Sequence, residues 1–206
     1  MRIIGLLLLS CSLCMSCVQT DKKKALIDDD FLVAEQHLSN QLKAVPEPTV
    51  YPRTIGKDGK LIATPKNDWT EGFYPGCLWY IYEHNREENW KQSAIKWTEA
   101  LEPMKKLTSH HDIGFLIYCS FGNAYRLTGK EEYKDVIIEA ANSLTTRFSE
   151  VTGCIKSWNY RKAWNGRDEW FYPVIIDNMM NLELLYFATK VKGDTKYDKT
   201  DTPHTE

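Results

Sequence analysis

Two aspartates, Asp112 and Asp177, each precede an apolar run with helical character, in HHDIGF (110–115) and VIIDNMMNL (174–182). An aspartate at such a position commonly caps the helix that follows. A pair of carboxyl groups can also carry acid/base chemistry, provided that apolar surroundings raise the pKa of one of them toward neutrality. Asp177 fits this second interpretation better than Asp112, which stands beside two histidines. Its apolar neighbours are Ile175, Ile176, Met179 and Met180.

Aromatic side chains cluster near these aspartates in two segments. WTEGFYPGCLW begins at Trp69, and SWNYRKAWNGRDEW (157–170) carries Trp158, Trp164 and Trp170. Indole rings offer flat apolar faces on which a pyranose ring can stack. The first segment is equally typical of a turn that lines a core, whereas indoles in a polar loop favour partial exposure and ligand contact.

No metal or cofactor is expected. His110, His111 and Asp112 are consecutive, so their side chains do not readily converge on one ion, and the sequence has no further cluster of ligands. It also has no glycine-rich phosphate loop and no GxSxG elbow.

The elements that must position these residues are helices. The spacing of Trp90, Ala94, Trp97, Leu101 and Met104 predicts one buried helical face. A second such face comprises Tyr133, Val136, Ile137, Ala140, Ala141, Leu144 and Phe148. The proline-rich interval 46–65 is expected to be a loop or a small hairpin.

Two segments, RLTGKEEYKD (126–135) and KVKGDTKYDK (190–199), share a glycine followed four residues later by a tyrosine. They predict equivalent corners of successive helical hairpins, with the glycine in the left-handed conformation. After Tyr197 the sequence turns polar, and we interpret residues 198–206 as a tail that marks a truncation. This interpretation predicts exposed apolar side chains on the preceding helix, namely Met180, Leu184, Leu185 and Ala188.

Residues 1–17 are interpreted as an export signal, because Arg2 precedes a short apolar stretch that ends near Cys17. The small residue before Cys17 resembles a lipoprotein cleavage site, which predicts acylation of that cysteine and a periplasmic or surface location. A soluble secreted form and acylation at Cys11 are the alternatives. Residues 18–27 would form a polar tether.

The remaining composition is that of an ordinary globular chain of 206 residues with a formal net charge of −2, which argues against binding to nucleic acid or to an anionic membrane. Beyond Cys17 only Cys77, Cys119 and Cys154 remain. This odd number predicts buried thiols in apolar surroundings and no disulfide framework.

Four motifs in order, WTEGFYPG, HHDIGF, IKSW (155–158) and VIIDNMMNLELL, resemble the N-terminal half of the unsaturated glucuronyl hydrolases of glycoside hydrolase family 88. The resemblance covers about residues 28–197. It implies an all-α fold, the first half of an (α/α)6 barrel. It also implies removal of a 4,5-unsaturated uronic acid from oligosaccharides that a polysaccharide lyase has produced, by hydration of the C4=C5 bond.

By the same resemblance, Asp177 is the principal acid/base and Asp112 its partner, while Trp69, His111 and Trp158 line the sugar pocket. Members of the family are close to twice this length, so activity of this chain stays open. So do the glycan, its linkage and its sulfation. The alternatives are a non-catalytic glycan-binding helical lipoprotein, an unsaturated rhamnogalacturonyl hydrolase, and a helical scaffold for protein partners.

Overall fold

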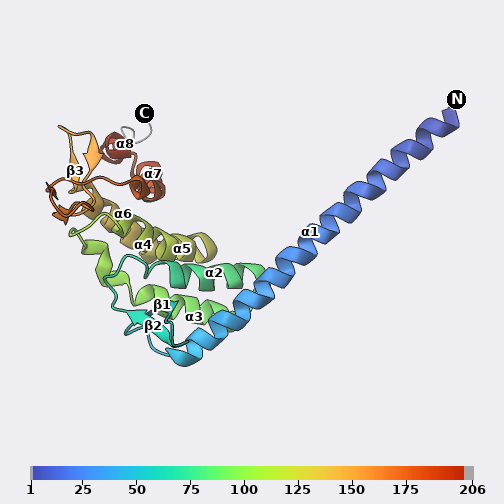
Figure 1. The fold of residues 1–206 in the computed structure, drawn as a ribbon. Coiled ribbons are helices and arrows are strands. Elements are labelled where there is room, and N and C mark those ends of the chain that lie inside the picture. Colours follow the sequence, from blue (N-terminus) through green and yellow to red (C-terminus); the bar gives the residue numbers. More distant parts are fainter. Residues whose placement is uncertain (1, 202–206) are drawn as a thin grey trace. The chain divides into compact units, whose positions relative to one another are not determined.

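The structure is a computed structural model that describes the backbone of residues 2–201 and the side chains of residues 22–198 and 200. It divides into two units, Met1–Ala44 and Val45–Glu206. The first unit is one helix, α1 (Arg2–Ala44), drawn in blue in Figure 1. Residues 18–27, expected to be a tether, belong to this helix, and the side chain of Cys17 lies outside the described residues. Over the part that the structure describes, no helix has the length and apolarity needed to cross a membrane.

The second unit is built from successive helical hairpins (Figure 1). The first pairs α2 (Phe73–Asn85) with α3 (Glu88–Glu99) and is followed by a 3₁₀ turn, η1 (Glu102–Lys106). The second opens with a broken helix made of α4 (Ile113–Ile117), the π-type segment η2 (Tyr118–Gly122) and α5 (Asn123–Thr128), and it returns through α6 (Glu131–Thr145). The third comprises the 3₁₀ segment η3 (Ile176–Asn181), α7 (Leu182–Lys192) and α8 (Thr195–Asp201).

Three small antiparallel hairpins lie in the segments between the helices. They are β1 (Tyr51–Ile55) with β2 (Leu61–Thr64), β3 (Phe148–Ser149) with β4 (Cys154–Ile155), and β5 (Arg161–Lys162) with β6 (Glu169–Trp170). The first lies within the proline-rich interval, which agrees with the expected small hairpin. The fold is therefore mostly helical, and the described residues form part of a hairpin ring and no closed barrel.

The core lies between the hairpin layers and uses the two predicted helical faces. Trp90, Ala94, Trp97 and Leu101 are buried on one face, and Met104 is half-buried at its end. On α6, six of the seven predicted residues are buried, and the seventh, Phe148, lies beyond the helix in β3 and is half-buried. The 3.6-residue period thus identified both buried faces, because each helix turns one apolar stripe toward its neighbours.

All three hairpin corners contain a left-handed residue followed four positions later by a buried aromatic. Gly129 (φ 67°) and Gly193 (φ 64°) confirm the two predicted corners, with Tyr133 and Tyr197 as their buried aromatics. At the first corner Arg86 (φ 61°) takes the same conformation. The aromatic there is Trp90, which is also buried. Only glycine adopts this conformation freely, so a corner at an arginine could not be predicted from residue type.

Three expectations about exposure are wrong. Leu184, Leu185 and Ala188 are fully buried, because α7 packs against α4, α6 and α8; only Met180 of the four expected residues is exposed. The predicted polar tail begins inside α8, whose residue Thr200 is also buried. Cys77, expected to be buried, is exposed on α2.

Candidate active site

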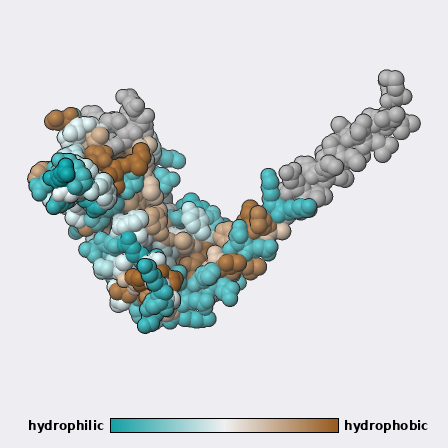
Figure 2. Space-filling model, viewed as in Figure 1, coloured by the Kyte–Doolittle hydropathy of each residue, from teal (hydrophilic) through white to brown (hydrophobic). Residues whose placement is uncertain are grey.

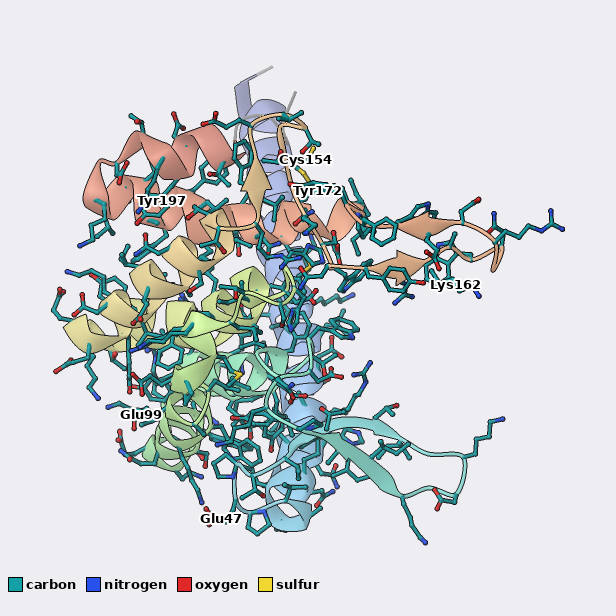
Figure 3. All side chains as sticks on the ribbon, turned by 90° about the vertical axis from the view of Figure 1, so that its left-hand side faces the viewer. Glu47, Glu99, Cys154, Lys162, Tyr172 and Tyr197 are labelled. Carbon is teal, nitrogen blue, oxygen red and sulfur yellow. The ribbon has the colours of Figure 1, made fainter. Side chains whose placement is uncertain are left out.

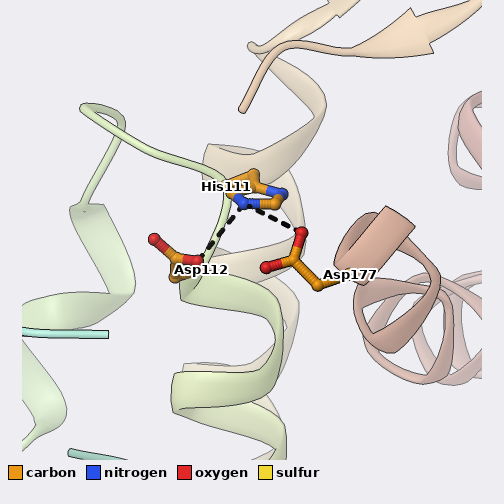
Figure 4. A group of neighbouring side chains, drawn as sticks. All are labelled: His111, Asp112 and Asp177. Atoms are coloured by element: carbon orange, nitrogen blue, oxygen red, sulfur yellow. Dashed lines mark ion pairs between the residues drawn. The ribbon is translucent and has the colours of Figure 1, made fainter. Parts of the chain in front are cut away.

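Three side chains from two distant segments meet at one point, as Figure 4 shows. His111 and Asp112 lie directly before α4, and Asp177 lies in the first turn of η3. The Nε2 atom of His111 is 3.3 Å from Oδ1 of Asp112 and 3.4 Å from Oδ1 of Asp177. Asp112 occupies the cap position of α4 but makes no capping hydrogen bond. Its carboxylate instead points to the two histidines, with Nδ1 of His110 at 2.8 Å from Oδ2.

The segment around Ser157 holds these two segments together. The backbone N–H of His111 donates to the Ser157 carbonyl oxygen (3.0 Å), and the Ser157 N–H donates to the carbonyl oxygen of Pro173 (2.8 Å). The Ser157 hydroxyl oxygen accepts the N–H of Ile175 at 3.1 Å. The loop before η3 is therefore tied by backbone bonds to the loop before α4, which fixes Asp177 beside His111.

Asn178 determines which nitrogen of His111 carries a proton. Its Nδ2 donates to the Ile155 carbonyl oxygen (2.9 Å), so its Oδ1 must face Nδ1 of His111, at 2.6 Å. An amide oxygen only accepts, and Nδ1 is therefore the N–H side of the ring. The Nε2 atom is left to share a proton with the two carboxyl groups.

The three groups have pKa values that separate their roles. Burial alone would raise the pKa of Asp112, but the hydrogen bonds and positive charges of His110 and His111 outweigh it and hold this pKa at about 2. Burial raises the pKa of Asp177, opposed by His111 and reinforced by the negative charge of Asp112. Burial would lower the pKa of His111, but Asp112, Asn178 and Asp177 together raise it. Near neutral pH, Asp112 is thus an anion, whereas the pKa values of His111 and Asp177 are both shifted toward the protonated form.

The expected cause of the raised pKa of Asp177 is only partly right. Of the four apolar neighbours that were expected to desolvate it, Ile176 is 86% exposed, and Met179 and Met180 are also exposed. Figure 2 shows a hydrophobic area over the place where Figure 1 labels α7. Asp177 is half-buried beside His111, and the negative charge of Asp112 raises its pKa further.

The aromatic residues predicted for the pocket surround this cluster. Trp158 packs edge-on against the His111 ring, with centroids 5.8 Å apart, and an isolated bridge pairs its backbone with that of His110. Trp69 is 46% exposed and packs edge-on against Phe73 and Phe115, the second of which also contacts His111. Trp79, at the other end of the segment that begins at Trp69, is a core residue whose indole N–H donates to the hydroxyl oxygen of Thr98.

The cluster also has the spacing of a metal-binding group, since ligand atoms of His111, Asp112 and Asp177 lie within 4.8 Å of one another. This convergence was not expected from the consecutive histidines, and it arises because Asp177 joins them from η3. The Nε2 atom of His111 and Oδ1 of Asp177 are both buried and make no hydrogen bond in the structure.

Replacement of Asn178 by alanine should lower the pKa of His111. The variant removes the acceptor of the Nδ1 proton and leaves a buried N–H without a partner, which costs about 1–3 kcal/mol of stability. The imidazole resonances, followed by NMR during a pH titration, give the pKa directly. Asn165→Ala, an exposed amide in the β5–β6 loop, is the control; an unchanged His111 pKa in Asn178→Ala would contradict the assigned tautomer.

A second titratable group lies buried beside Trp69. Glu71 is 1% exposed, and its Oε1 atom accepts a hydrogen bond from the Thr64 hydroxyl. Burial, with the charge of Asp68, raises its pKa from 4.5 to about 7 against the opposing effects of Thr64 and Arg53. Because the folded state holds this proton more tightly than the unfolded state, folding loses stability as the pH rises from 4.5 through about 7.

Glu71→Gln should therefore become more stable than the native chain as the pH rises. The amide keeps the acceptor for Thr64 but does not titrate, so its advantage should grow by roughly 3 kcal/mol between about pH 5 and about pH 8. Urea unfolding at the two pH values measures this difference. Glu150→Gln, an exposed carboxylate, serves as the control. A difference that does not change with pH would show that Glu71 is ionised throughout.

Asn178 and Ser157 were not among the residues predicted from the sequence. Asn178 could have been predicted, because it is a polar amide within the apolar run VIIDNMMNL and a buried amide requires hydrogen-bond partners. Ser157 had no such signal, since its role depends on the folded position of the loop before η3.

Stacked helical hairpins carry a carboxyl pair at the start of α4 and η3, an arrangement that resembles the helical glycoside hydrolases. The chain is 42% identical over 156 residues to an unsaturated glucuronyl hydrolase of Formosa agariphila, which covers 75% of this chain and 38% of the relative. It is 35% identical over 145 residues to an unsaturated chondroitin disaccharide hydrolase of Streptococcus agalactiae (66% and 34%). No family model matches the chain.

Solved structures agree with these sequence relationships. A crystal structure of an unsaturated glucuronyl hydrolase specific for heparin superposes with a TM-score of 0.77 at 36% identity, over 85% of this chain and 45% of that one. The enzyme from Streptococcus agalactiae gives a TM-score of 0.69 at 28% identity, with the same coverage. The chain is a partial protein of glycoside hydrolase family 88, related to the unsaturated glucuronyl hydrolases, and it spans less than half the length of these relatives.

Proposed function

We propose that this chain carries the acid/base site of an unsaturated glucuronyl hydrolase, which removes a 4,5-unsaturated uronic acid from lyase-generated oligosaccharides. One observation carries the proposal. A carboxyl group with a raised pKa, Asp177, lies across His111 from a carboxylate with a pKa of about 2, and the half-buried indole of Trp158 packs against His111. This pairing supplies a proton donor and a fixed negative charge within the span of one sugar ring.

Asp177 is the proposed proton donor to C4 of the enol ether. As C4 gains the proton, positive charge develops at C5, and water adds there while returning its own proton to the Asp177 carboxylate. The net change is addition of one water across the double bond, and Asp177 is regenerated. The negative charge of the Asp112 carboxylate helps to raise the pKa of Asp177 and so favours the protonated form that donates.

The product of this addition is a hemiketal at C5. It opens to a C5 ketone, and the ring oxygen becomes a hydroxyl on C1. C1 then carries both this hydroxyl and the glycosidic oxygen, and the resulting hemiacetal breaks to an aldehyde and a free leaving sugar. No glycosyl-enzyme intermediate is required, so the usual relation between carboxylate separation and stereochemical outcome does not apply.

The uronic acid ring is proposed to lie between Trp69 and Trp158, with His111 at its edge. These residues surround the carboxyl pair, and stacking on an indole orients a pyranose without restricting its hydroxyl pattern. An unsaturated glucuronyl hydrolase of Streptococcus agalactiae has been crystallised with dGlcA-GalNAc6S, which makes that disaccharide a suitable first substrate.

Incubation of the 206-residue chain with this disaccharide tests the proposal. Hydration destroys the conjugated enol ether, so its ultraviolet absorbance should fall while free GalNAc6S is released. A disaccharide with a saturated uronic acid is the control and should remain intact. Binding of both disaccharides without loss of absorbance would favour the alternative, a non-catalytic glycan-binding protein; preference for an unsaturated rhamnogalacturonan disaccharide would favour the related hydrolase activity.

The location proposed for this site is the periplasm or the cell surface. The support is the apolar N-terminal segment that ends at Ser16-Cys17. Labelling of expressing cells with a palmitate analogue should mark the native chain but not a Cys17→Ala variant, and equal labelling of both would contradict acylation at this residue.

A further inference from the structure

The hairpin of β5 and β6 forms a second aromatic surface next to the candidate active site. It stands out from the helices in Figure 3, where Lys162 marks β5 and Tyr172 lies where the chain returns to the helices. Arg161 pairs with Trp170 across the hairpin, and Lys162 pairs with Glu169. Because side chains alternate between the faces of a strand pair, Arg161 and Trp170 share one face. Tyr160 and Phe171 pack together on the other, with centroids 5.7 Å apart.

The loop of this hairpin is fixed by its own hydrogen bonds. The N–H of Ala163 donates to the Asp168 carbonyl oxygen, and that of Gly166 donates to the Ala163 carbonyl oxygen, both at 2.9 Å. The Asn165 side chain donates to the Asp168 carboxylate and accepts the N–H of Arg167. The loop therefore holds Trp164 in place although that indole is 81% exposed.

Arg161 lies against two indoles. The guanidinium carbon is 5.0 Å from the ring centroid of Trp158 and 4.8 Å from that of Trp164. Within the described part of the chain, no carboxylate pairs with Arg161. Stacking on aromatic rings occupies the faces of a guanidinium and leaves its N–H edge available for a bidentate anion such as sulfate or carboxylate.

These side chains line a cavity of about 310 Å³, together with Trp170, Tyr172 and Ile175. The cavity adjoins the carboxyl cluster on two sides. Trp158 contacts His111, and Ile175 immediately precedes the segment that carries Asp177. Its volume is at the lower end of the range for small-ligand pockets, about 300–1,000 Å³, which suits a single sugar residue.

We propose that this cavity binds the leaving sugar of the substrate, with Trp164 stacked on its pyranose ring and the Arg161 guanidinium paired with its anionic substituent. The proposal rests on the function proposed above, since it places the leaving sugar beside the site that receives the unsaturated uronic acid. The shared chemistry is an anionic sugar, whose charge comes either from a sulfate ester or from a carboxylate.

Four variants of the full chain test this subsite. Trp164→Ala and Arg161→Gln remove its two main contacts. Phe171→Ala is a matched control, because Phe171 is 66% exposed on the opposite face of the same hairpin. Arg167→Gln removes the same charge from an exposed loop position that has no aromatic contact. All four changes are at the surface or in the hairpin, and thermal melts check that each variant is folded.

The subsite variants should raise KM for dGlcA-GalNAc6S by roughly tenfold or more, with little change in kcat, because they lose a charge-assisted hydrogen bond or a stacking contact. The controls should change KM by less than about twofold. If sulfate is the anchor, Arg161→Gln should affect the sulfated disaccharide and spare the unsulfated one. If a carboxylate is the anchor, it should affect both disaccharides equally.

A ligand without the double bond separates this proposal from the proposed function. Ligand-observed NMR with methyl N-acetylgalactosaminide 6-sulfate reports binding of the leaving sugar alone. Binding that Trp164→Ala abolishes would support the subsite even if the chain hydrolyses nothing. Turnover with the same KM in all four variants would overturn the subsite and leave the proposed function intact, and a chain that neither turns over the disaccharide nor binds the methyl glycoside would overturn both.

Discussion

Asp177→Asn should lower turnover of the unsaturated disaccharide by about 10²–10⁴-fold, the usual contribution of a general acid. The amide has nearly the same shape but holds no acidic proton, so binding of the disaccharide should persist. The loss of enol-ether absorbance measures turnover, and titration calorimetry measures binding. Asp135→Asn, an exposed carboxylate on α6, is the matched control and should retain full activity.

The pH dependence of the native chain gives an independent check on the same residue. Burial raises the pKa of Asp177. The donor form is present below that pKa and is lost as the pH rises through it, so kcat should fall on the alkaline side. Turnover by Asp177→Asn at the native rate, or a native kcat that increases steadily with pH, would rule out Asp177 as the acid.

Gly72→Ala should destabilise the second unit by about 3 kcal/mol, which corresponds to a fall in Tm of roughly 6–12 °C. Gly72 has an ordinary helical backbone (φ −67°), so its conformation does not require glycine. Glycine is required here because the backbone of α4 lies directly against this position. An added Cβ would lie 2.6 Å from the Cα of Leu116 and in collision with the carbonyl oxygen of that residue. Because these are backbone atoms of α4, no side-chain movement can relieve the overlap.

Gly76→Ala, one turn further along α2, is the control. The closest approach of its added Cβ is 3.0 Å, to the carbonyl oxygen of Cys119, and alanine recovers up to about 1 kcal/mol of helix propensity in the interior of a helix. Thermal melts should therefore show a small change for this variant and a large one for Gly72→Ala. Equal melting temperatures for the two variants would mean that the backbone of Leu116 leaves room for a methyl group at position 72.

The helices and their buried faces could be predicted because periodicity and glycine corners are local properties. The corners at Gly129 and Gly193 were predicted in this way. The corner at Arg86 was not, because arginine rarely adopts the left-handed conformation. The approach of Asp177 to Asp112 had no local signal, and only the resemblance to a known family brought the two together. The apolar neighbours of Asp177 were expected to cover it, but proximity in sequence does not indicate which way each side chain points, so the exposure of Ile176 was not foreseen.

The repeated corner has a consequence for how the chain acquires its structure during synthesis. Each hairpin closes through a left-handed residue and an aromatic four positions later, so its first stabilising contacts join residues that leave the ribosome almost together. Short-range closure costs little chain entropy and proceeds quickly. The carboxyl pair, in contrast, waits for the third hairpin, so the nascent chain becomes compact well before it has an acid and its partner.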